Sequence, residues 1–493
     1  MTLGKTLVWL LILAGAIAFA LGRWVVRTFG HITLDQAIMN LDGAGEGGGK
    51  EFVYEAILEA LVVPIILVIS LWLIVRVIRN SLRKHDSSST VRRVAYVLPA
   101  LVLAAVPLAG AWSLGSALQV RQYIASRDPS LDLADHYVLP QLQESNDDSP
   151  TNLVLIYLES IENTFGDDEV FEINMLESIQ EATADWDYID PLEQYPGGGW
   201  TMSGIVSTQC GIPLRMPPSA GIEGTETLDH SSELNRMTTS SYLAGTTCLG
   251  DVLQEQGYKN VFMGGADASF ASKGQYFTQH GYSEFLDRKY WEQQGETEFT
   301  ESWGLSDSRL LENAKAELAK LESEGEPFSL TVLTLDTHEP APRFASCEQR
   351  SEYPLVDATR CSMDAVADFL SFASRQGYLE DTTFVVMGDH LKFITTGESL
   401  GADFTDYENR SIFNRIESPV AGEIRLKTVD QFDMFPTILE AMGFALTDGR
   451  AGLGVSAYNA STPPGSLHQL SSEEREALIR SRSSDFFASM WAE

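Results

Sequence analysis

The sequence predicts an α/β domain with a mostly parallel sheet, preceded by a bundle of three transmembrane helices. Two observations support this prediction. Beyond residue 150, short apolar runs alternate with segments of helical periodicity, which is typical of a parallel sheet covered by helices on both faces. Before residue 121, three long apolar stretches each approach the roughly 20 residues that cross a hydrocarbon core.

The predicted membrane spans cover about residues 6–22, 56–75 and 94–120. The first and third contain no charged residue, and the second contains only Glu59. A cleaved signal peptide is the alternative for the first span, because Ala18–Ala20 resembles a cleavage site of small residues. Buried core helices are the alternative for the other two. Membrane lipid is therefore an expected partner of this region.

Loop charges predict the orientation. The loop between spans two and three holds six Lys/Arg and one Asp, whereas the loop between spans one and two holds three Lys/Arg and five Asp/Glu. Because basic loops stay in the cytoplasm, everything after about Gln122 is expected outside it. We therefore predict a multi-pass protein of the inner membrane, with a linker at 122–150, a periplasmic or outer domain at 151–462, and a polar tail at 463–493.

The charge of the chain is unevenly distributed. Residues 1–120 hold ten Lys/Arg and seven Asp/Glu, a net of +3, and the remainder holds 24 against 62, a net of −38. Such an acidic domain repels nucleic acid, which excludes that class of partner. It also repels an anionic bilayer, so the helices must provide the tether. Solubility or a salty habitat explains the acidity better than a functional role.

All four cysteines lie in the predicted outer domain. An even count in an oxidising compartment suggests two disulfides. Cys347 and Cys361 flank a short polar loop, so we pair them and pair Cys210 with Cys248, although the other two pairings stay open. Zinc is not indicated, because the chain has no C-x-x-C and no histidine at finger spacing.

Polar residues follow three of the predicted strands of the outer domain. The predicted strands are 153–158, 260–265, 328–336 and 383–390, and the predicted helices are 246–258, 308–323, 363–376, the later part of 428–443, and 472–480. Glu159 follows the first strand, Asp336 and His338 the third, and Asp389 and His390 the fourth. In parallel sheets, ligands bind at these carboxyl ends of the strands.

Glu159, Asp389 and His390 together predict a site for a divalent cation. Two carboxylates and one imidazole suit manganese or magnesium better than structural zinc. The alternatives are a carboxylate at a helix N-terminus for Glu159, and a turn with a solvated aspartate for the Gly388–His390 segment.

The stretch "YPGGGWTMSGIVSTQCGIPL" contains the candidate nucleophile. Thr201 follows three glycines that would let the backbone approach an anion, and a helix N-terminus there would attract phosphate. The alternative is that Thr201 only caps a helix. Sulfatases use a cysteine within C-x-P-x-R, but here "CGIPLR" places Pro213 and Arg215 one residue too far.

Six elements carry a resemblance: "NLVLIYLES", "GWTMSGIVSTQCGIPL", "CLGDVLQEQGY", "FASKGQYFTQHGY", "LDTHEP" and "GDH". In order and spacing they resemble the membrane phosphoglycerol transferases of the alkaline-phosphatase/sulfatase superfamily, which include a glucan-modifying branch and the lipoteichoic acid synthases. The resemblance covers most of residues 150–445 and implies an alkaline-phosphatase-like domain. It implies one Mn²⁺ or Mg²⁺ ion held by Glu159, Thr201, Asp389 and His390.

The resemblance also implies roles for substrate-facing residues. Thr201 matches the nucleophile, and His338 matches a histidine that faces the substrate phosphate. Where the synthases hold glycerol phosphate with a tryptophan and an arginine, this chain has Ala271 and Lys273. Lys273 can still bind phosphate as a point charge. The missing tryptophan leaves head-group recognition open.

The expected reaction transfers phosphoglycerol from phosphatidylglycerol to a hydroxyl of a cell-envelope glycan through a covalent threonine intermediate. His338 could act as a general acid, given its ordinary pKa of about 6.5. The alternatives are a phosphoethanolamine transferase, a phosphodiesterase, or a membrane sensor without catalysis.

Overall fold

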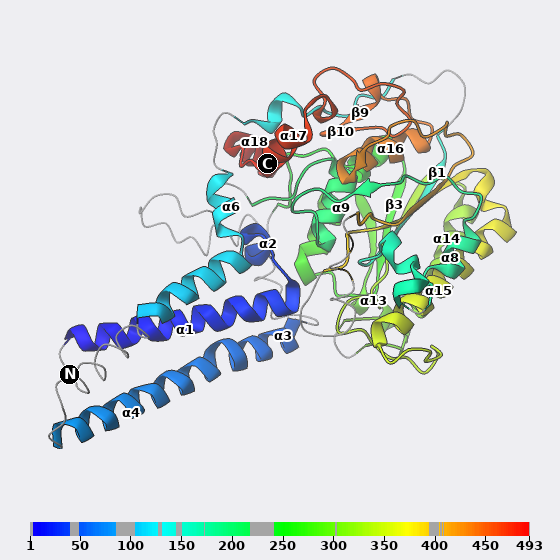
Figure 1. Ribbon diagram of the computed structural model, residues 1–493. Coiled ribbons are helices and arrows are strands. Elements are labelled where there is room, and N and C mark those ends of the chain that lie inside the picture. Colours follow the sequence, from blue (N-terminus) through cyan, green and yellow to red (C-terminus); the bar gives the residue numbers. More distant parts are fainter. Residues whose placement is uncertain are drawn as a thin grey trace. The chain divides into compact units, whose positions relative to one another are not determined.

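The computed structural model describes residues 3–39, 49–84, 104–126, 131–143, 150–171, 173–216, 241–300, 303–393, 404, 407 and 409–492. These residues form two compact units, one ending at Ala125 and one beginning at Ser126. Figure 1 colours the chain from its N-terminus to its C-terminus.

The first unit contains two helical stretches that are long and apolar enough to cross a membrane, Thr6–Phe29 and Val53–Ile78. They include the first two predicted spans. Their helices are α1 (Leu3–Phe29), α3 (Gly49–Ala56), the π-helix η1 (Ile57–Val62) and α4 (Val63–Lys84), and the shorter α2 (Leu34–Met39) and α6 (Val120–Ala125) complete the unit's named helices. Of the third predicted span, residues 94–103 lie outside the described residues and 104–117 are helical, so that span stays a prediction.

The π-helix η1 has a local cause. Pro64 has no N–H, and its ring clashes with the carbonyl four residues earlier, so the turn before it cannot keep regular α-helical bonding. The Val63 N–H donates instead to the Leu58 carbonyl, five residues back. Glu59, in this widened turn, pairs with Arg27 at 2.8 Å. The single charge in the second predicted span therefore has a partner on α1.

Close backbone contact joins α1 to the helical residues 104–117. A Cβ atom added to Gly110 would lie 2.1 Å from the Gly15 carbonyl oxygen, and one added to Gly22 would lie 2.6 Å from the Ser113 backbone. Helices approach this closely only where both present small residues, as is common within membranes. The first predicted span is therefore part of a helix pair within this unit.

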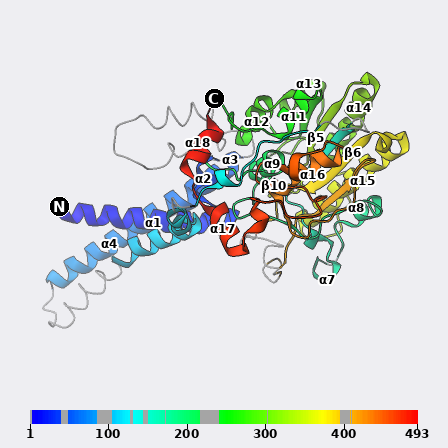
Figure 2. The same ribbon diagram turned by 90° about the horizontal axis from the view of Figure 1, so that it is seen from above.

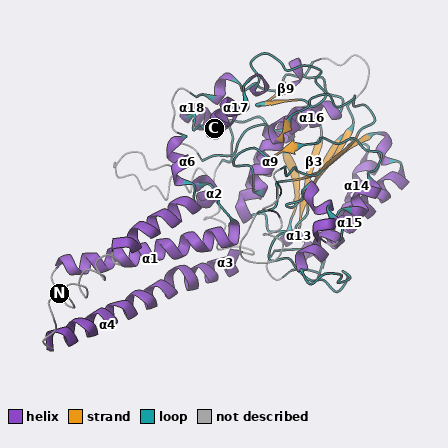
Figure 3. Ribbon diagram, in the orientation of Figure 1, coloured by secondary structure: helices purple, strands orange, loops and turns teal. Residues whose placement is uncertain are grey.

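The second unit is built on a six-stranded sheet with the strand order β4-β3-β5-β1-β6-β7. Neighbouring strands are parallel except for β7, which runs antiparallel to β6. The strands are β1 (Asn152–Leu158), β3 (Lys259–Gly264), β4 (Tyr282–Leu286), β5 (Phe328–Leu333), β6 (Thr382–Gly388) and β7 (Asn414–Glu417), drawn in orange in Figure 3. The four predicted strands are confirmed, whereas β4 and β7 were not predicted.

The register of the central strands sets the position of the strand-end residues. β1 lies between β5 and β6, and all three are buried. Leu158, the last residue of β1, pairs with Gly388, the last residue of β6. Glu159 and Asp389 therefore emerge side by side at the same edge of the sheet.

Helices cover both faces of the sheet, with α8, α14 and α15 on one side and α9 and α16 on the other (Figure 1). Their bounds are α8 (Glu177–Ala182), α9 (Thr201–Cys210), α14 (Asp307–Glu324), α15 (Pro354–Gln376) and α16 (Met434–Ala441); α7 (Asp168–Phe171), α11 (Leu249–Glu255), α12 (Lys273–Gln279) and α13 (Arg288–Gln294) are shorter. The helix predicted from Met363 begins nine residues earlier, at Pro354, because proline is favoured in a first helical turn.

Two-stranded pairs and the chain end complete the second unit. β2 (Leu192–Glu193) pairs with β8 (Val429–Asp430), and β9 (Arg450–Ala451) with β10 (Gly454–Val455). The end of the chain forms α17 (Ser472–Arg480) and α18 (Ser484–Trp491), red in Figure 2. It does not stay a separate polar tail, because the apolar face of α18 is buried: its buried side chains are Phe486, Phe487, Met490 and Trp491.

Candidate metal centre and active site

Glu159 occupies the first position after β1 and is 4% exposed. Its Oε1 accepts a hydrogen bond of 2.7 Å from the Ser160 hydroxyl, and its Oε2 accepts one of 3.1 Å from the Thr201 hydroxyl. Burial by itself would raise the pKa of this carboxyl. The positive charges of His338 and His390 when protonated, the hydrogen bond from Ser160 and the charge of Lys392 outweigh burial and lower the pKa. Glu159 is therefore a carboxylate near neutral pH.

Asp389 and His390 come directly after β6. Asp389 is fully buried, and its Oδ1 accepts the backbone N–H groups of Ser160 and His390 at 2.8 and 2.9 Å. Its Oδ2 has no hydrogen-bond donor among the described residues. Burial, and then the charge of Glu159, raise the pKa of Asp389. A buried carboxylate with a bare oxygen is costly unless a cation balances it.

His390 presents its Nε2 to the same place. Because a carbonyl can only accept, the 2.8 Å contact with the Leu391 oxygen assigns the proton to His390 Nδ1. Nε2 lies 3.6 Å from both Glu159 Oε1 and Asp389 Oδ2. This geometry is that of a histidine oriented for a metal by its second nitrogen.

The ligand atoms of Glu159, Asp389 and His390 all lie within 4.8 Å of one another. Two carboxylates and one imidazole form a mixed oxygen and nitrogen donor set that suits a divalent cation such as manganese. The unpartnered Asp389 Oδ2 and the bare His390 Nε2 fit a cation between them. The side chains predicted from three separate positions are thus brought together.

Thr201 is the first residue of α9, with Trp200 as the capping residue. Its hydroxyl donates a hydrogen bond to Glu159, and the capping position of α9 belongs to Trp200. Thr201 is therefore not the helix cap that the sequence left as an alternative. Helix α9 reaches the cluster because Gly204 has no side chain: a Cβ there would lie 2.0 Å from the Asp389 carbonyl oxygen. The helix N-terminus, which favours anions, therefore opens beside the three ligands.

A cleft lies beside the candidate metal centre and shares Glu159 and Thr201 with it. Its lining includes Glu159, Thr201, Lys273, Trp303 and His338, with the remaining wall formed by Phe262, Gly264, Gly265, Ala266, Phe270, Leu333, Thr334 and Leu335. The structure therefore brings the predicted nucleophile, histidine and lysine to one surface.

Lys273 begins α12 and is 5% exposed. Its Nζ lies 4.6 Å from the centroid of the Phe270 ring. Burial lowers its pKa to about 8, even though Glu159, Asp267 and Asp389 favour the charged form. At neutral pH it is a buried ammonium on the wall of the cleft, which suits binding of phosphate.

His338 is held as a neutral imidazole. Burial lowers its pKa, and Glu159 offsets only part of that effect. Its Nδ1 donates to the Glu339 carbonyl at 2.9 Å, so Nε2 is an acceptor in the resting state. The arrangement favours a general base over the general acid that the ordinary pKa suggested.

Sequence reasoning missed three residues of this region. Gln431 donates its Nε2 proton to the Asp389 carbonyl at 2.9 Å, and Lys392 pairs with Glu339 at 2.8 Å, linking the loops after β6 and β5. Trp303 packs against His338 with ring centroids 3.8 Å apart and ring planes tilted by 47°. No local pattern marks them, although Lys392 lies two residues after "GDH".

Both predicted disulfides are present. The bond between Cys210 and Cys248 joins the C-terminal end of α9 to the start of α11. Asp251 and His280 lie near Cys248 in a second cluster, but its sulfur is bonded to Cys210, and Asp251 accepts the His280 Nδ1 proton at 2.7 Å. This second cluster is therefore a structural one.

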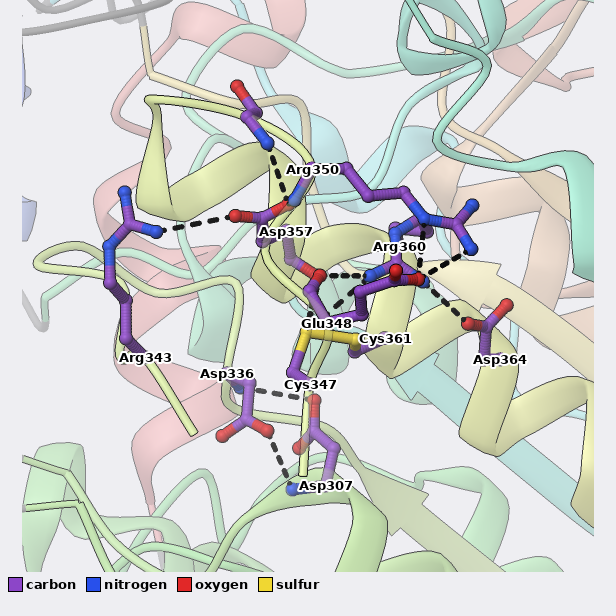
Figure 4. The surroundings of a disulfide bond; sticks show 11 residues. Asp307, Asp336, Arg343, Cys347, Glu348, Arg350, Asp357, Arg360, Cys361 and Asp364 are labelled. Atoms are coloured by element: carbon purple, nitrogen blue, oxygen red, sulfur yellow. Dashed lines mark hydrogen bonds and ion pairs between the residues drawn. A yellow bond between two sulfur atoms is a disulfide. The ribbon is translucent and has the colours of Figure 1, made fainter. Parts of the chain in front are cut away.

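The bond between Cys347 and Cys361 joins the loop before α15 to a residue within that helix (Figure 4). Figure 4 also shows Asp336, the third predicted strand-end carboxylate, beside Asp307. Asp336 N–H donates to Asp307 Oδ2 at 3.1 Å, and Asp307 N–H donates to Asp336 Oδ2 at 2.9 Å. Asp336 therefore ties the end of β5 to α14 and does not join the candidate ligands.

The sheet and the cluster at its edge define an alkaline-phosphatase-like α/β domain. Residues 227–444 match the family model Sulfatase. Among solved structures, the lipoteichoic acid synthase LtaP from Listeria monocytogenes superposes with a TM-score of 0.52 at 16% identity, covering 72% of this chain and 96% of that one.

Two curated relatives share a higher sequence identity with this chain than LtaP does. Phosphoglycerol transferase I of Xanthomonas axonopodis pv. citri is 35% identical over 248 residues, which are 49% of this chain and 34% of the relative. Phosphoglycerol transferase I of Escherichia coli is 29% identical over 344 residues, 68% of this chain and 42% of the relative. The chain thus spans less than half the length of these curated relatives.

Proposed function

We propose that this protein is a membrane-tethered, metal-dependent phosphoglycerol transferase. The observation that carries the proposal is the convergence of Thr201 with Glu159, Asp389 and His390, together with a cleft that Thr201 and Glu159 share with Lys273 and His338. Relatives named phosphoglycerol transferase I support the class of reaction.

The first half-reaction uses Thr201 as the nucleophile. Its hydrogen bond directs the hydroxyl proton toward the Glu159 carboxylate, which leaves oxygen lone pairs for the phosphorus of phosphatidylglycerol. As Thr201 Oγ bonds to phosphorus, its proton passes to the Glu159 carboxylate and the bond between phosphorus and the diacylglycerol oxygen breaks. The diacylglycerol oxygen takes up a proton from solvent, and a glycerophospho-threonine remains. Lys273 and the N-terminus of α9 stabilise the phosphoryl charge.

The second half-reaction uses the hydroxyl of an acceptor, for which we propose a cell-envelope glycan. Neutral His338 accepts the proton of that hydroxyl at Nε2 as the hydroxyl attacks phosphorus and the bond between phosphorus and Thr201 Oγ breaks. Thr201 regains its proton from Glu159, and His338 returns its proton to solvent. The loop bond between Lys392 and Glu339 keeps His338 near the strand end.

Glu159, Asp389, His390 and Thr201 would hold one Mn²⁺ or Mg²⁺ ion. When bound, such an ion supplies a Lewis acid that lowers the pKa of a coordinated hydroxyl and balances phosphoryl charge. The donor set supports this assignment, since Asp389 Oδ2 and His390 Nε2 are both available to a cation.

We also propose that the protein resides in the inner membrane with its catalytic domain facing outward. The apolar stretches Thr6–Phe29 and Val53–Ile78 support a membrane anchor. An anchored domain is kept close to a lipid donor, and the acidic outer domain would otherwise be repelled by an anionic bilayer.

The test incubates the purified full chain with phosphatidylglycerol vesicles and Mn²⁺, and measures diacylglycerol release together with the mass of the peptide containing Thr201. We expect release and an added glycerophosphate, both lost in Thr201→Ala. Normal turnover by Thr201→Ala would refute the nucleophile. Metal binding without release or adduct would favour the non-catalytic sensor, and release from phosphatidylethanolamine alone would favour the phosphoethanolamine transferase.

A further inference from the structure

Trp303 lies at the centre of an aromatic wall inside the cleft. Its ring centroid is 3.8 Å from that of His338 on one side and 5.7 Å from that of Phe270 on the other. Lys273 Nζ lies 4.6 Å from the centre of the Phe270 ring. The four side chains all line the cleft, as does Thr201.

The backbone around Trp303 is held firmly against the end of β3. Thr300 Oγ1 accepts the N–H groups of Trp303 and Gly304 at 2.8 and 2.9 Å. A Cβ added to Gly304 would lie 2.0 Å from the Gly265 carbonyl oxygen, which also accepts the Leu305 N–H at 3.1 Å. The indole is 4% exposed, so it is a preformed part of the cleft.

The ionisable side chains that line the cleft do not balance one another in charge. Among the described residues that line it, the ionisable groups are Glu159, Lys273 and His338, and Glu159 belongs to the candidate metal centre. His338 is neutral for the reasons given above. Lys273 forms no ion pair with a described residue, and its ammonium already occupies the vicinity of the Phe270 face. Asp267, which does not line the cleft, also favours the charged form of Lys273, but its carboxylate pairs with Lys289 at 2.9 Å. Among the described lining residues, the cleft therefore offers a positive charge and no carboxylate outside the candidate metal centre.

This charge pattern discriminates between head groups. The phosphate of a ligand would pair with Lys273, and the C–H groups of an uncharged polyol would pack on the indole of Trp303. An ammonium group on the same phosphate would lie close to Lys273, and among the described lining residues it would find no carboxylate outside the candidate metal centre to balance it. Repulsion by Lys273 thus opposes the attraction that an aromatic wall alone would offer to a cation.

We infer that Trp303 is a substrate-contacting residue that, together with Lys273, selects phosphate esters of uncharged polyols and rejects those that bear an ammonium. The inference rests on the proposed function, because it assigns the head-group end of the same cleft. It assigns Trp303 a role in binding that goes beyond orienting His338.

A binding experiment tests the inference without requiring turnover. Glycerol 1-phosphate and O-phosphoethanolamine are titrated by calorimetry into the full-length protein in detergent with saturating Mn²⁺. We expect glycerol phosphate to bind about tenfold or more tightly, as one good packing or charge contact provides. Equal affinities for the two compounds would overturn the inference.

Variants separate binding from positioning. Trp303→Leu should weaken glycerol phosphate binding about tenfold, and Trp303→Phe, which keeps an aromatic face, by less than about threefold. Lys273→Met should weaken both ligands and bring their affinities within about threefold of each other. Trp112→Leu, at a side chain that is 80% exposed in the first unit, is the matched control and should change nothing.

The contrary outcome is equally clear. If Trp303→Leu binds glycerol phosphate like the wild type while its kcat for phosphatidylglycerol falls, Trp303 only positions His338. Thermal unfolding of each variant checks the fold, and Trp303→Phe keeps the test informative if Trp303→Leu is unstable. Failure of the wild type to release diacylglycerol would instead refute the proposed reaction and leave the binding preference to be judged separately.

Discussion

The backbone N–H of Ser160 donates a 2.8 Å hydrogen bond to Asp389 Oδ1, across two neighbouring strand ends. Ser160 adopts a left-handed conformation with φ of 58°, which costs a non-glycine residue about 1–2 kcal/mol. The same turn directs its hydroxyl to Glu159 Oε1 at 2.7 Å. One strained residue therefore orients both candidate carboxylate ligands.

Ser160→Ala should lower Mn²⁺ affinity by about tenfold, because partners that orient metal ligands typically contribute that much. The backbone bond to Asp389 would remain, so the fold should be preserved. Calorimetric titration of Mn²⁺ into the full chain measures the change. Ser323→Ala, which removes an exposed hydroxyl bonded to the Lys320 carbonyl, is the control. Equal affinities in both variants would mean that Ser160 does not support the metal centre.

Gly204→Ala should reduce the rate of diacylglycerol release by about 100-fold, the cost of misplacing reacting groups by about 1 Å. The new Cβ would meet the Asp389 carbonyl oxygen at 2.0 Å, so α9 or the strand-end loop must move and Thr201 with it. Gly115→Ala, at a helical glycine with open space around its Cβ position, is the control. A Gly204→Ala enzyme with normal activity would show that α9 can shift without consequence.

Donor binding should depend on pH through Lys273. Burial lowers its pKa from the ordinary 10.5 to about 8, so its ammonium is present below pH 8 and lost above it. We expect the KM for phosphatidylglycerol to rise as pH increases through 8. In Lys273→Arg the guanidinium stays charged, and KM should remain flat to about pH 10. Parallel profiles of the two proteins at saturating Mn²⁺ would exclude Lys273 as the phosphate partner.

The buried Lys273 should also make the free energy of unfolding depend on pH. Between pH 8 and 10.5 the unfolded chain keeps the Lys273 proton that the folded chain has released. Because the unfolded state then binds more protons, this group makes the free energy of unfolding rise with pH in that window. Lys273→Met should lack this contribution, which urea unfolding at pH 8 and pH 10 would measure.

The chain end should contribute to stability. Phe487 is 2% exposed, and deleting a buried phenylalanine side chain typically costs about 3–5 kcal/mol. Phe487→Ala should therefore lower the free energy of unfolding by several kcal/mol in urea titration. Leu139→Ala, at a side chain that is 57% exposed, should have little effect. Equal stabilities of the two variants would mean that the chain end is dispensable.

Local pattern was enough to predict the central strands. β1, β5 and β6 are buried, and such strands form continuous apolar runs that end abruptly at polar residues. β4 and β7 were not predicted. β4 has an exposed and two half-buried residues among its five, and β7 alternates buried and half-buried positions, so neither shows a continuous apolar run. Edge strands depend on pairing with a neighbour, which the local sequence does not show.

The candidate site likewise contains residues that the sequence predicted and residues that it did not. Glu159, Asp389 and His390 follow predicted strands, and Thr201 and Lys273 lie within recognisable elements. Trp303 and Gln431 belong to no such element, and their contacts with His338 and Asp389 join residues far apart in the chain. Asp336 looked equivalent to the other strand-end carboxylates, but its bonds to Asp307 give it another partner.

By itself, the sequence determined which residues could carry charge, ligate a metal or enter a membrane, because these properties belong to side chains and to apolar length. Only the tertiary structure decided which of them meet. Strand register places Glu159 beside Asp389, close packing at Gly204 admits Thr201, and burial sets the protonation of Lys273 and His338. Distances and desolvation arise from the packed chain, and no short segment contains them.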